Sequence, residues 1–157
     1  MTELLKVVGN KTHLLIIGEG PQYAQLVRWR DCVQITDRVH FLGHRNDVPV
    51  LLPHLTCFWS GSAYEGQSNA IMEAMNAGVP VIATDIPGNR DLIAPEETGL
   101  LYPVGDRATL ARLTQRLLDD PALGSRLSAA AQQRMREHFS VAQMVARYAA
   151  FYQRILA

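Results

Sequence analysis

Apolar and polar residues alternate in blocks along the first two thirds of the chain. Short aliphatic runs that end in glycine or polar residues are typical of strands buried on both faces of a parallel sheet. The segments between them carry apolar residues at three- and four-residue spacing, which predicts helices. Five strands are predicted, around the sequences HLLIIG, RVHFLG, LTCFWS, PVIATD and GLLYP. This order predicts an α/β protein with a Rossmann-like, doubly wound parallel sheet in three layers, α/β/α.

The last third of the chain has helical periodicity only. Asp106, Asp120 and Ser140 are predicted to cap three successive helices, and Gln143 completes a capping box with Ser140. The last of these extra C-terminal helices has an apolar stripe, for which we predict core packing. The stripe consists of Val141, Met144, Val145, Tyr148, Tyr152 and Ile155.

The beginning of the chain has an unusual order of elements. The segment TELLKVVGN is typical of the end of a helix, and it leads directly into the first predicted strand. A doubly wound sheet ordinarily has a strand ahead of such a helix. We therefore expect residues 1–157 to form a single domain that is truncated at its N-terminus.

Size and charge limit the classes of function. The 157 residues suffice for one domain, and 15 basic residues balance 15 acidic ones, so no net field attracts nucleic acid or anionic lipid. The longest apolar runs are too short to span a membrane, and no signal peptide is evident. Cys32 and Cys57 lack metal-site spacing and are predicted to be buried free thiols. These features predict a soluble, cytoplasmic protein with no metal site.

Ligands of doubly wound sheets bind beyond the carboxyl ends of the strands. Among the loops predicted there, the segment EGQSN, residues 65–69, is the most informative. Gly66 would allow the backbone to approach a ligand, and the start of the following helix would present unpaired N–H groups to a phosphate. The simpler alternative is that Ser68 or Asn69 only caps the helix, and spacing alone does not separate the two.

Two glutamates, Glu65 and Glu73, lie on either side of this helix start. They could be the two carboxylates of a glycoside hydrolase, two acceptors for hydroxyl pairs on either side of a phosphate, or ordinary helix residues. No P-loop is present, because the sequence contains neither GKS nor GKT. The dinucleotide fingerprint is incomplete, because Tyr23 replaces its third glycine after Gly18 and Gly20.

The stretch SAYEGQSNAIMEAMNAGVPVIATDIPGNRDLI resembles the signature of retaining glycosyltransferases of family 4, the glycosyl transferases group 1. LLIIGEGP, VHFLGHRNDV and ETGLLYPVGD resemble further segments of that family, in the same order. The resemblance implies one half of a GT-B fold: the C-terminal domain, which binds a nucleotide-diphosphate sugar for transfer to a hydroxyl acceptor. It implies no metal and no bound cofactor, and an N-terminal acceptor domain that is absent here.

The resemblance also assigns roles to residues. Glu73 would hold the ribose diol of the nucleotide, and Glu65, the candidate catalytic residue, would contact hydroxyls of the donor sugar. The remaining candidates are backbone and side chains along the sugar, the diphosphate and the base: Gly66, Gln67, Ser68, Asn69, Gly43, His44 and Arg45.

One part of the family pattern is missing. Members carry an Arg and a Lys that neutralise the diphosphate, and Lys6 and Lys11 lie in the wrong context for this role. We therefore expect these cations to lie outside the chain and the isolated fragment to be inactive. The full-length parent could be peripheral at the cytoplasmic membrane face. The alternative from another class is a non-catalytic nucleotide-binding module, or a signalling module with a flavodoxin-like sheet.

Overall fold

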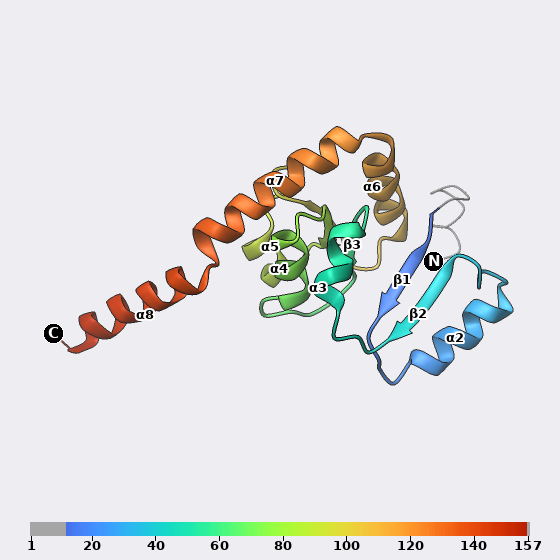
Figure 1. Ribbon diagram of the computed structural model, residues 1–157, viewed down its shortest axis with the longest axis horizontal. Coiled ribbons are helices and arrows are strands. Elements are labelled where there is room, and N and C mark those ends of the chain that lie inside the picture. The colour runs from blue at the N-terminus through green and yellow to red at the C-terminus, as the bar shows by residue number, and fades with distance from the viewer. Residues whose placement is uncertain (1–11, 157) are drawn as a thin grey trace.

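The computed structural model describes residues 12–156 (Figure 1), so Lys6, Lys11 and the predicted helix end before the first strand lie outside the described residues. Strands and helices alternate up to residue 102, and helices alone follow, as the sequence predicts. The elements are β1 (Leu14–Ile17), α2 (Tyr23–Cys32), β2 (Val39–Gly43), α3 (Val48–Leu51), a 3-10 turn (Leu52–His54), β3 (Phe58–Ser60), α4 (Asn69–Asn76), β4 (Val81–Thr84), α5 (Pro87–Leu92), β5 (Leu100–Tyr102), α6 (Arg107–Asp119), α7 (Pro121–His138) and α8 (Val141–Leu156).

All strand pairs are parallel, which confirms the fold class, but the five strands form two sheets. β1 pairs with β2, and β3, β4 and β5 form a second sheet with β4 in the centre. A Rossmann sheet has the strand order 3-2-1-4-5-6. The observed orders match its two halves without strand 1. Among residues 12–156, no strand pairs with the free edges of β1 and β3.

The three layers follow from the alternation of side chains along β4. Val81 and Ala83 face one side of the sheet, where they pack with Ile71 and Met75 of α4. Ile82 faces the other side, where its cluster includes residues of β5, α6 and α7. Because helices cover both faces, all four residues of β4 are buried.

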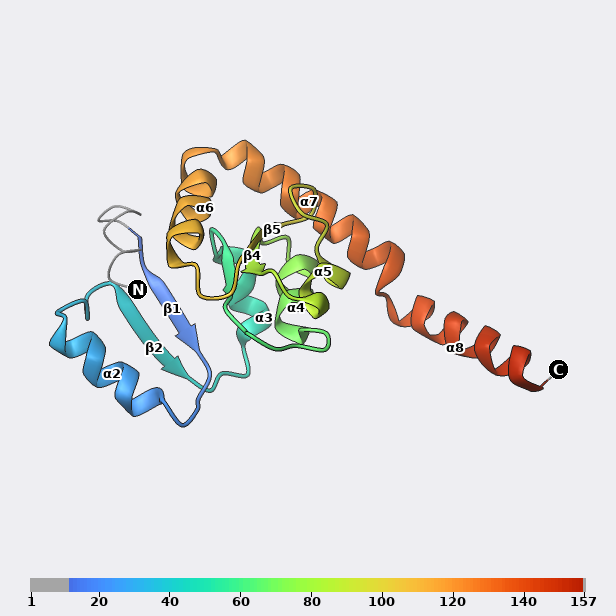
Figure 2. The same cartoon turned by 180° about the vertical axis from the view of Figure 1, so that it is seen from behind.

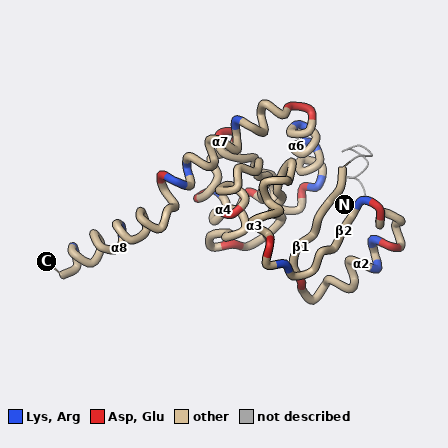
Figure 3. Tube along the Cα trace, in the orientation of Figure 1, with Lys and Arg blue, Asp and Glu red and all other residues tan. Residues whose placement is uncertain are grey.

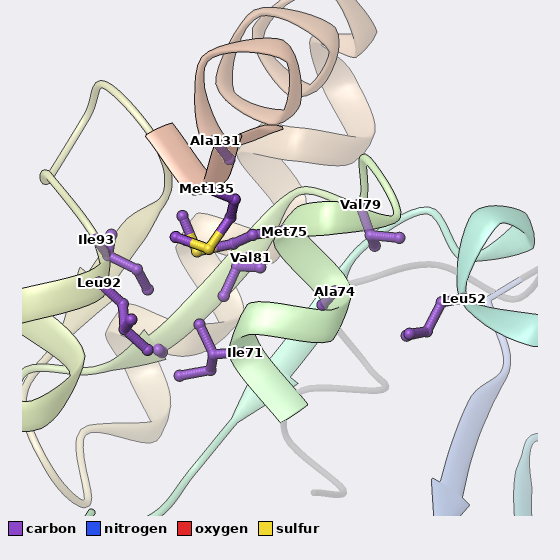
Figure 4. Packing of buried hydrophobic residues seen from close by; sticks show 11 residues of the cluster. Leu52, Ile71, Ala74, Met75, Val79, Val81, Leu92, Ile93, Ala131 and Met135 are labelled. Atoms are coloured by element: carbon purple, nitrogen blue, oxygen red, sulfur yellow. The ribbon is translucent and has the colours of Figure 1, made fainter. Parts of the chain in front are cut away.

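The larger of these clusters joins distant parts of the chain (Figure 4). Met135 of α7 lies beside Met75 of α4, and Leu92 and Ile93 approach from the end of α5. Met135 is 2% exposed and Met75 is fully buried. α4 is thereby held against α7 and the sheet, which sets the position of its N-terminus.

A smaller cluster connects the two-stranded sheet to the rest of the molecule. Val39 of β2 and Ala111 of α6 are its buried members, with Trp59 of β3 packed against them. Between residues 12 and 43, Val39 is the single fully buried position. This half of the sheet therefore has a much thinner core than the half around β4.

The predicted helix caps are confirmed. Asp106 Oδ1 accepts a hydrogen bond from the Thr109 amide at 2.9 Å, and Asp120 Oδ1 accepts one from the Leu123 amide at 3.0 Å. Ser140 Oγ accepts from the Gln143 amide at 3.3 Å at the start of α8. These signals involve residues only three positions apart, so they can be identified from the sequence alone.

The prediction that the α8 stripe packs in a core is wrong for this chain. α8 extends away from the body of the molecule (Figures 1 and 2), and its described residues are all exposed. Tyr148 and Tyr152 are each 58% exposed, and Ile155 is 61% exposed. The helical period was correctly identified, but no described element lies where the stripe could pack.

Both cysteines are free, as predicted, but only one of them is shielded from solvent. Cys32 at the end of α2 is exposed, so its predicted burial is wrong. Cys57 is half-buried beside β3, and burial raises the pKa of its thiol to about 11. Neither thiol is paired with the other.

Candidate functional site

The loop between β3 and α4, residues 61–67, forms the centre of the candidate site. It begins where β3 ends and runs to Ser68, which is 6% exposed. Ser68 Oγ accepts a hydrogen bond from the Ile71 amide at 3.4 Å and caps α4. Ser68 thus caps the helix, as the simpler of the two interpretations of the EGQSN segment predicts. The helix start next to it still presents the first-turn amides of Asn69 and Ala70, which have no helical acceptor.

The two glutamates lie on either side of this helix start, as predicted. Glu65 is half-buried in the loop, and Glu73 is exposed one turn into α4. Within residues 12–156, neither carboxylate forms an ion pair. Gly66, Gln67 and Asn69 are exposed around them. The group is therefore accessible to a ligand with hydroxyl groups near a phosphate.

Three residues behind the loop were not among the predicted site residues. Thr84, at the end of β4, donates a hydrogen bond from Oγ1 to the Ser62 carbonyl at 2.5 Å. Asn89 of α5 donates from Nδ2 to the Thr84 carbonyl at 2.9 Å. Gly88 lies directly against the loop backbone. The sequence offered one signal for this contact, the glycine of the PGN turn.

The second group of predicted residues, Gly43, His44 and Arg45, lies at the end of β2. Gly43 has φ +63°, a conformation that favours glycine, and its carbonyl accepts from the Gly18 amide at 2.8 Å. The ends of β1 and β2 are thereby tied together. His44 Nε2 lies 3.1 Å from Asn46 Oδ1. Its side chain is thus engaged within the turn, leaving backbone groups to face a ligand.

The arginines at these strand ends already have carboxylate partners. Arg45 donates from Nε to Asp47 at 2.8 Å, and its hydrogen bonds lower the pKa of Asp47. Arg90 donates from Nη2 to Asp85 at 2.9 Å and lowers the pKa of Asp85 in the same way. Both pairs lie at the surface. Each guanidinium uses its Nε and one Nη for this pair, and the carboxylate offsets its positive charge.

The ends of β1 and β2 and the β3–α4 loop lie toward the same side of the molecule. In Figure 1, β1 and β2 point downward, and the green loop before α4 lies on that lower side. A hollow of about 500 Å³ lies beside the end of β1, lined by residues including Gly18, Glu19 and Tyr23. The strand ends thus lie along one edge of the molecule, which is where the sequence predicts ligand binding. They also divide it into a β1–β2 part and a β3–α4 part.

Charged groups are spread over the molecule (Figure 3). Among residues 12–156, there is no group of three or more His, Cys, Asp or Glu side chains placed to hold a metal ion. The helices of the same range include none with the length and hydropathy needed to cross a bilayer.

Comparison with known proteins identifies the family. The model of the family described as "Glycosyl transferases group 1" matches residues 1–120. The chain therefore belongs to this family. It is 35% identical over 129 residues to the lipopolysaccharide core biosynthesis glycosyltransferase LpsD of Rhizobium meliloti, a match that covers 82% of this chain and 38% of the relative. It is 32% identical over 143 residues to N-acetyl-alpha-D-glucosaminyl L-malate synthase of Bacillus anthracis, covering 91% and 38%.

Solved structures confirm the fold as half of a GT-B glycosyltransferase. Anabaena HepE in complex with UDP superposes with a TM-score of 0.90 at 23% identity, covering 97% of this chain and 43% of that one. HepE in complex with UDP-glucose gives a TM-score of 0.89 at 24% identity, with the same coverage. The chain thus spans less than half the length of these relatives. A signalling module finds no support among these matches.

Proposed function

We propose that this chain binds the donor in a glycosyltransferase that moves a sugar from a nucleotide diphosphate to a hydroxyl acceptor. The observation that carries the proposal is the pairing of Glu65 and Glu73 across the start of α4, at a strand end of a GT-B half-domain. The family membership and the UDP-glucose complex of a structural neighbour support this choice of ligand.

Glu73 binds the nucleotide in this proposal. Its carboxylate is exposed, so it can accept hydrogen bonds from both hydroxyls of a ribose. Glu65, half-buried in the loop, accepts from hydroxyls of the donor sugar. The first-turn amides of α4 face the diphosphate between them, where the helix dipole favours negative charge.

The cations that neutralise the diphosphate come from elsewhere in the full-length protein. Arg45 and Arg90 are already paired with Asp47 and Asp85, which makes them poor candidates. We propose that transfer needs no metal, because backbone and cationic side chains can stabilise the departing diphosphate. We further propose that the anomeric configuration is retained, with the acceptor hydroxyl attacking the face from which the diphosphate leaves.

A further domain of the same polypeptide supplies the acceptor site in this proposal. α8 supports it, because an apolar stripe whose residues are 52–73% exposed is suited to packing against another surface. HepE shares the fold over 97% of this chain and has more than half of its own length beyond the match. Two free cysteines, one of them exposed, suit the cytoplasm as the compartment.

Titration of the chain with UDP and UDP-glucose tests the division of roles between the glutamates. Glu73→Ala is expected to weaken both ligands by about 5- to 150-fold, which corresponds to about 1–3 kcal/mol for lost charge-assisted hydrogen bonds. Glu65→Ala is expected to weaken UDP-glucose alone, because UDP has no sugar for Glu65 to contact. Isothermal titration calorimetry measures the dissociation constants of both ligands.

The matched control is Glu97→Ala, which removes an exposed carboxylate from the turn before β5. It should leave both affinities unchanged. Equal losses for both ligands in Glu65→Ala would contradict the assignment of Glu65 to the sugar. If the folded wild-type chain bound none of UDP, GDP, ADP or their sugars, the proposed donor function itself would be wrong.

The isolated chain should not catalyse transfer, since the cations and the acceptor site lie outside it. A radiolabelled-sugar transfer assay with this chain checks the expectation, and measurable transfer would contradict it.

A further inference from the structure

The β3–α4 loop has few contacts of its own that could hold its shape. Between Gly61 and Gln67, the bond from Thr84 to the Ser62 carbonyl is the hydrogen bond that the structure shows to the described residues. Tyr64, near the middle of the loop, is 95% exposed. Glu65 follows it directly, so the position of its carboxylate depends on whatever holds the loop from behind.

The hydrogen bond to the loop is itself held in place by a buried amide. Thr84 is 1% exposed and Asn89 is fully buried. Asn89 Nδ2 donates to the Thr84 carbonyl at 2.9 Å and lies 3.2 Å from Thr84 Oγ1. Because a carbonyl can only accept, the amide nitrogen must face Thr84. The hydroxyl then accepts from Asn89 and has its one proton free for Ser62.

The second anchor is a backbone contact that only glycine permits. A Cβ added to Gly88 would lie 2.3 Å from the carbonyl oxygens of both Glu65 and Gly66. Backbone atoms cannot swing away as the end of a long side chain can. Gly88 therefore lets α5 lie directly against the peptide that carries Glu65.

The buried side chain of Asn89 has hydrogen-bond partners on one side only. Its Oδ1 is buried without a hydrogen-bond partner among the described residues, which costs free energy. The two bonds from Nδ2 explain what the residue provides in return: they orient the Thr84 hydroxyl toward the loop. Asn89 thus contributes to the shape of the β3–α4 loop.

We propose that Thr84, Gly88 and Asn89 form a brace that holds the β3–α4 loop and so positions Glu65 for the donor sugar. The three are positioning residues, since they act through the loop backbone. The positioning of Glu65 rests on the proposed function, whereas the holding of the loop does not. The brace thus sets selectivity for the sugar-bearing ligand over the bare nucleotide.

Two substitutions at Thr84 separate the hydrogen bond from the packing. Thr84→Val keeps the shape and removes the hydroxyl, and Thr84→Ser keeps the hydroxyl. In the ligand-free chain, ¹⁵N relaxation should give order parameters of about 0.85 for residues 62–66 in the wild type and Thr84→Ser, falling below about 0.6 in Thr84→Val. Unchanged order parameters in Thr84→Val would overturn the brace.

Titration with UDP and UDP-glucose then tests the consequence for Glu65. Thr84→Val should raise the Kd for UDP-glucose by about five-fold, as expected for one ordinary hydrogen bond, with the Kd for UDP unchanged. Thr84→Ser should restore the wild-type ratio. Equal changes in the Kd for both ligands would show that the brace only supports the fold, and would overturn the positioning of Glu65.

Gly88→Ala tests the backbone contact independently of Thr84. It should increase loop motion and weaken UDP-glucose selectively, whereas the control Gly124→Ala should do neither, because the added Cβ meets only Pro80 Cγ at 3.4 Å. A loop unaffected by Gly88→Ala would overturn this half of the brace. If the wild type bound neither ligand, the proposed function and the positioning of Glu65 would fail together, and the order parameters would still decide whether the brace exists.

Discussion

At the scale of single residues, the ends of the helices show how local chemistry responds to pH. Asp106 accepts hydrogen bonds from the first turn of α6, and the bond from the Thr109 backbone is the main reason why the pKa of its carboxyl is lowered. A carboxyl whose pKa is lower in the folded state stabilises the fold above its unfolded pKa, which is about 3.9 for aspartate. That contribution is lost as the pH falls through the folded pKa.

Asp106→Asn is therefore expected to reduce the acid sensitivity of the chain. Asparagine still caps the helix but does not titrate, so the loss of thermal stability between about pH 4 and pH 2 should be shallower than in the wild type. Thermal unfolding followed by circular dichroism across this range measures it. Asp37→Asn, at an exposed turn position, is the control and should keep the wild-type slope. Parallel pH profiles for Asp106→Asn and the wild type would contradict the prediction.

At the scale of elements, α8 and α7 are both amphipathic but differ in what covers them. Leu127 of α7 is fully buried in the cluster with α6, β4 and β5. Val145 and Tyr152 of α8 are 57% and 58% exposed. Similar patterns of apolar residues thus stabilise the fold of this chain in α7 but not in α8.

The double substitution Val145→Ser and Tyr152→Ser should change the free energy of unfolding by no more than about 0.5 kcal/mol. Leu127→Ala, the buried comparison, should cost about 2–5 kcal/mol. Urea unfolding of the three proteins measures both values. A loss in the double variant as large as that in Leu127→Ala would show that the α8 stripe is buried in solution.

At the scale of the whole molecule, the split sheet divides the fold into a thick and a thin core. β4 is buried on both faces, whereas Val39 is the one fully buried residue from 12 to 43. Segments with few buried apolar contacts open more readily than the global transition. The β1–α2–β2 part should therefore be the less stable half.

Native-state hydrogen exchange should show this difference directly. Amides of β1 and β2 should exchange about ten-fold or more faster than those of β4, since local openings cost less than global unfolding. Val39→Ala should speed exchange in β1 and β2 only, whereas Val81→Ala should speed it in all strands. Equal protection of β1 and β4 in the wild type would contradict a division into two units.

Much of the fold could be predicted from the sequence because its signals are local. The five strands and the caps at Asp106, Asp120 and Ser140 depend on neighbouring residues and formed as expected. The position of Glu65 and Glu73 at one helix start also follows from the sequence, but their roles remain predictions.

Other features depend on residues far apart in the chain. The exposed α8 stripe has the same period as a buried one, so the sequence could not reveal what covers it. The division into two sheets depends on which strands lie side by side, and local patterns do not determine this. Thr84 contributes to the candidate site through its hydrogen bond to the Ser62 carbonyl, and Asn89 contributes through its hydrogen bond to the Thr84 carbonyl. No rule of sequence spacing identifies either bond.

The sequence by itself thus determined the elements, their order and the family, because periodicity, caps and motifs involve residues close in the chain. Only the tertiary structure decided which faces are buried, where the sheet is interrupted and what holds the β3–α4 loop. Those outcomes depend on contacts between distant segments, such as the approach of Gly88 to the backbone of Glu65 and Gly66.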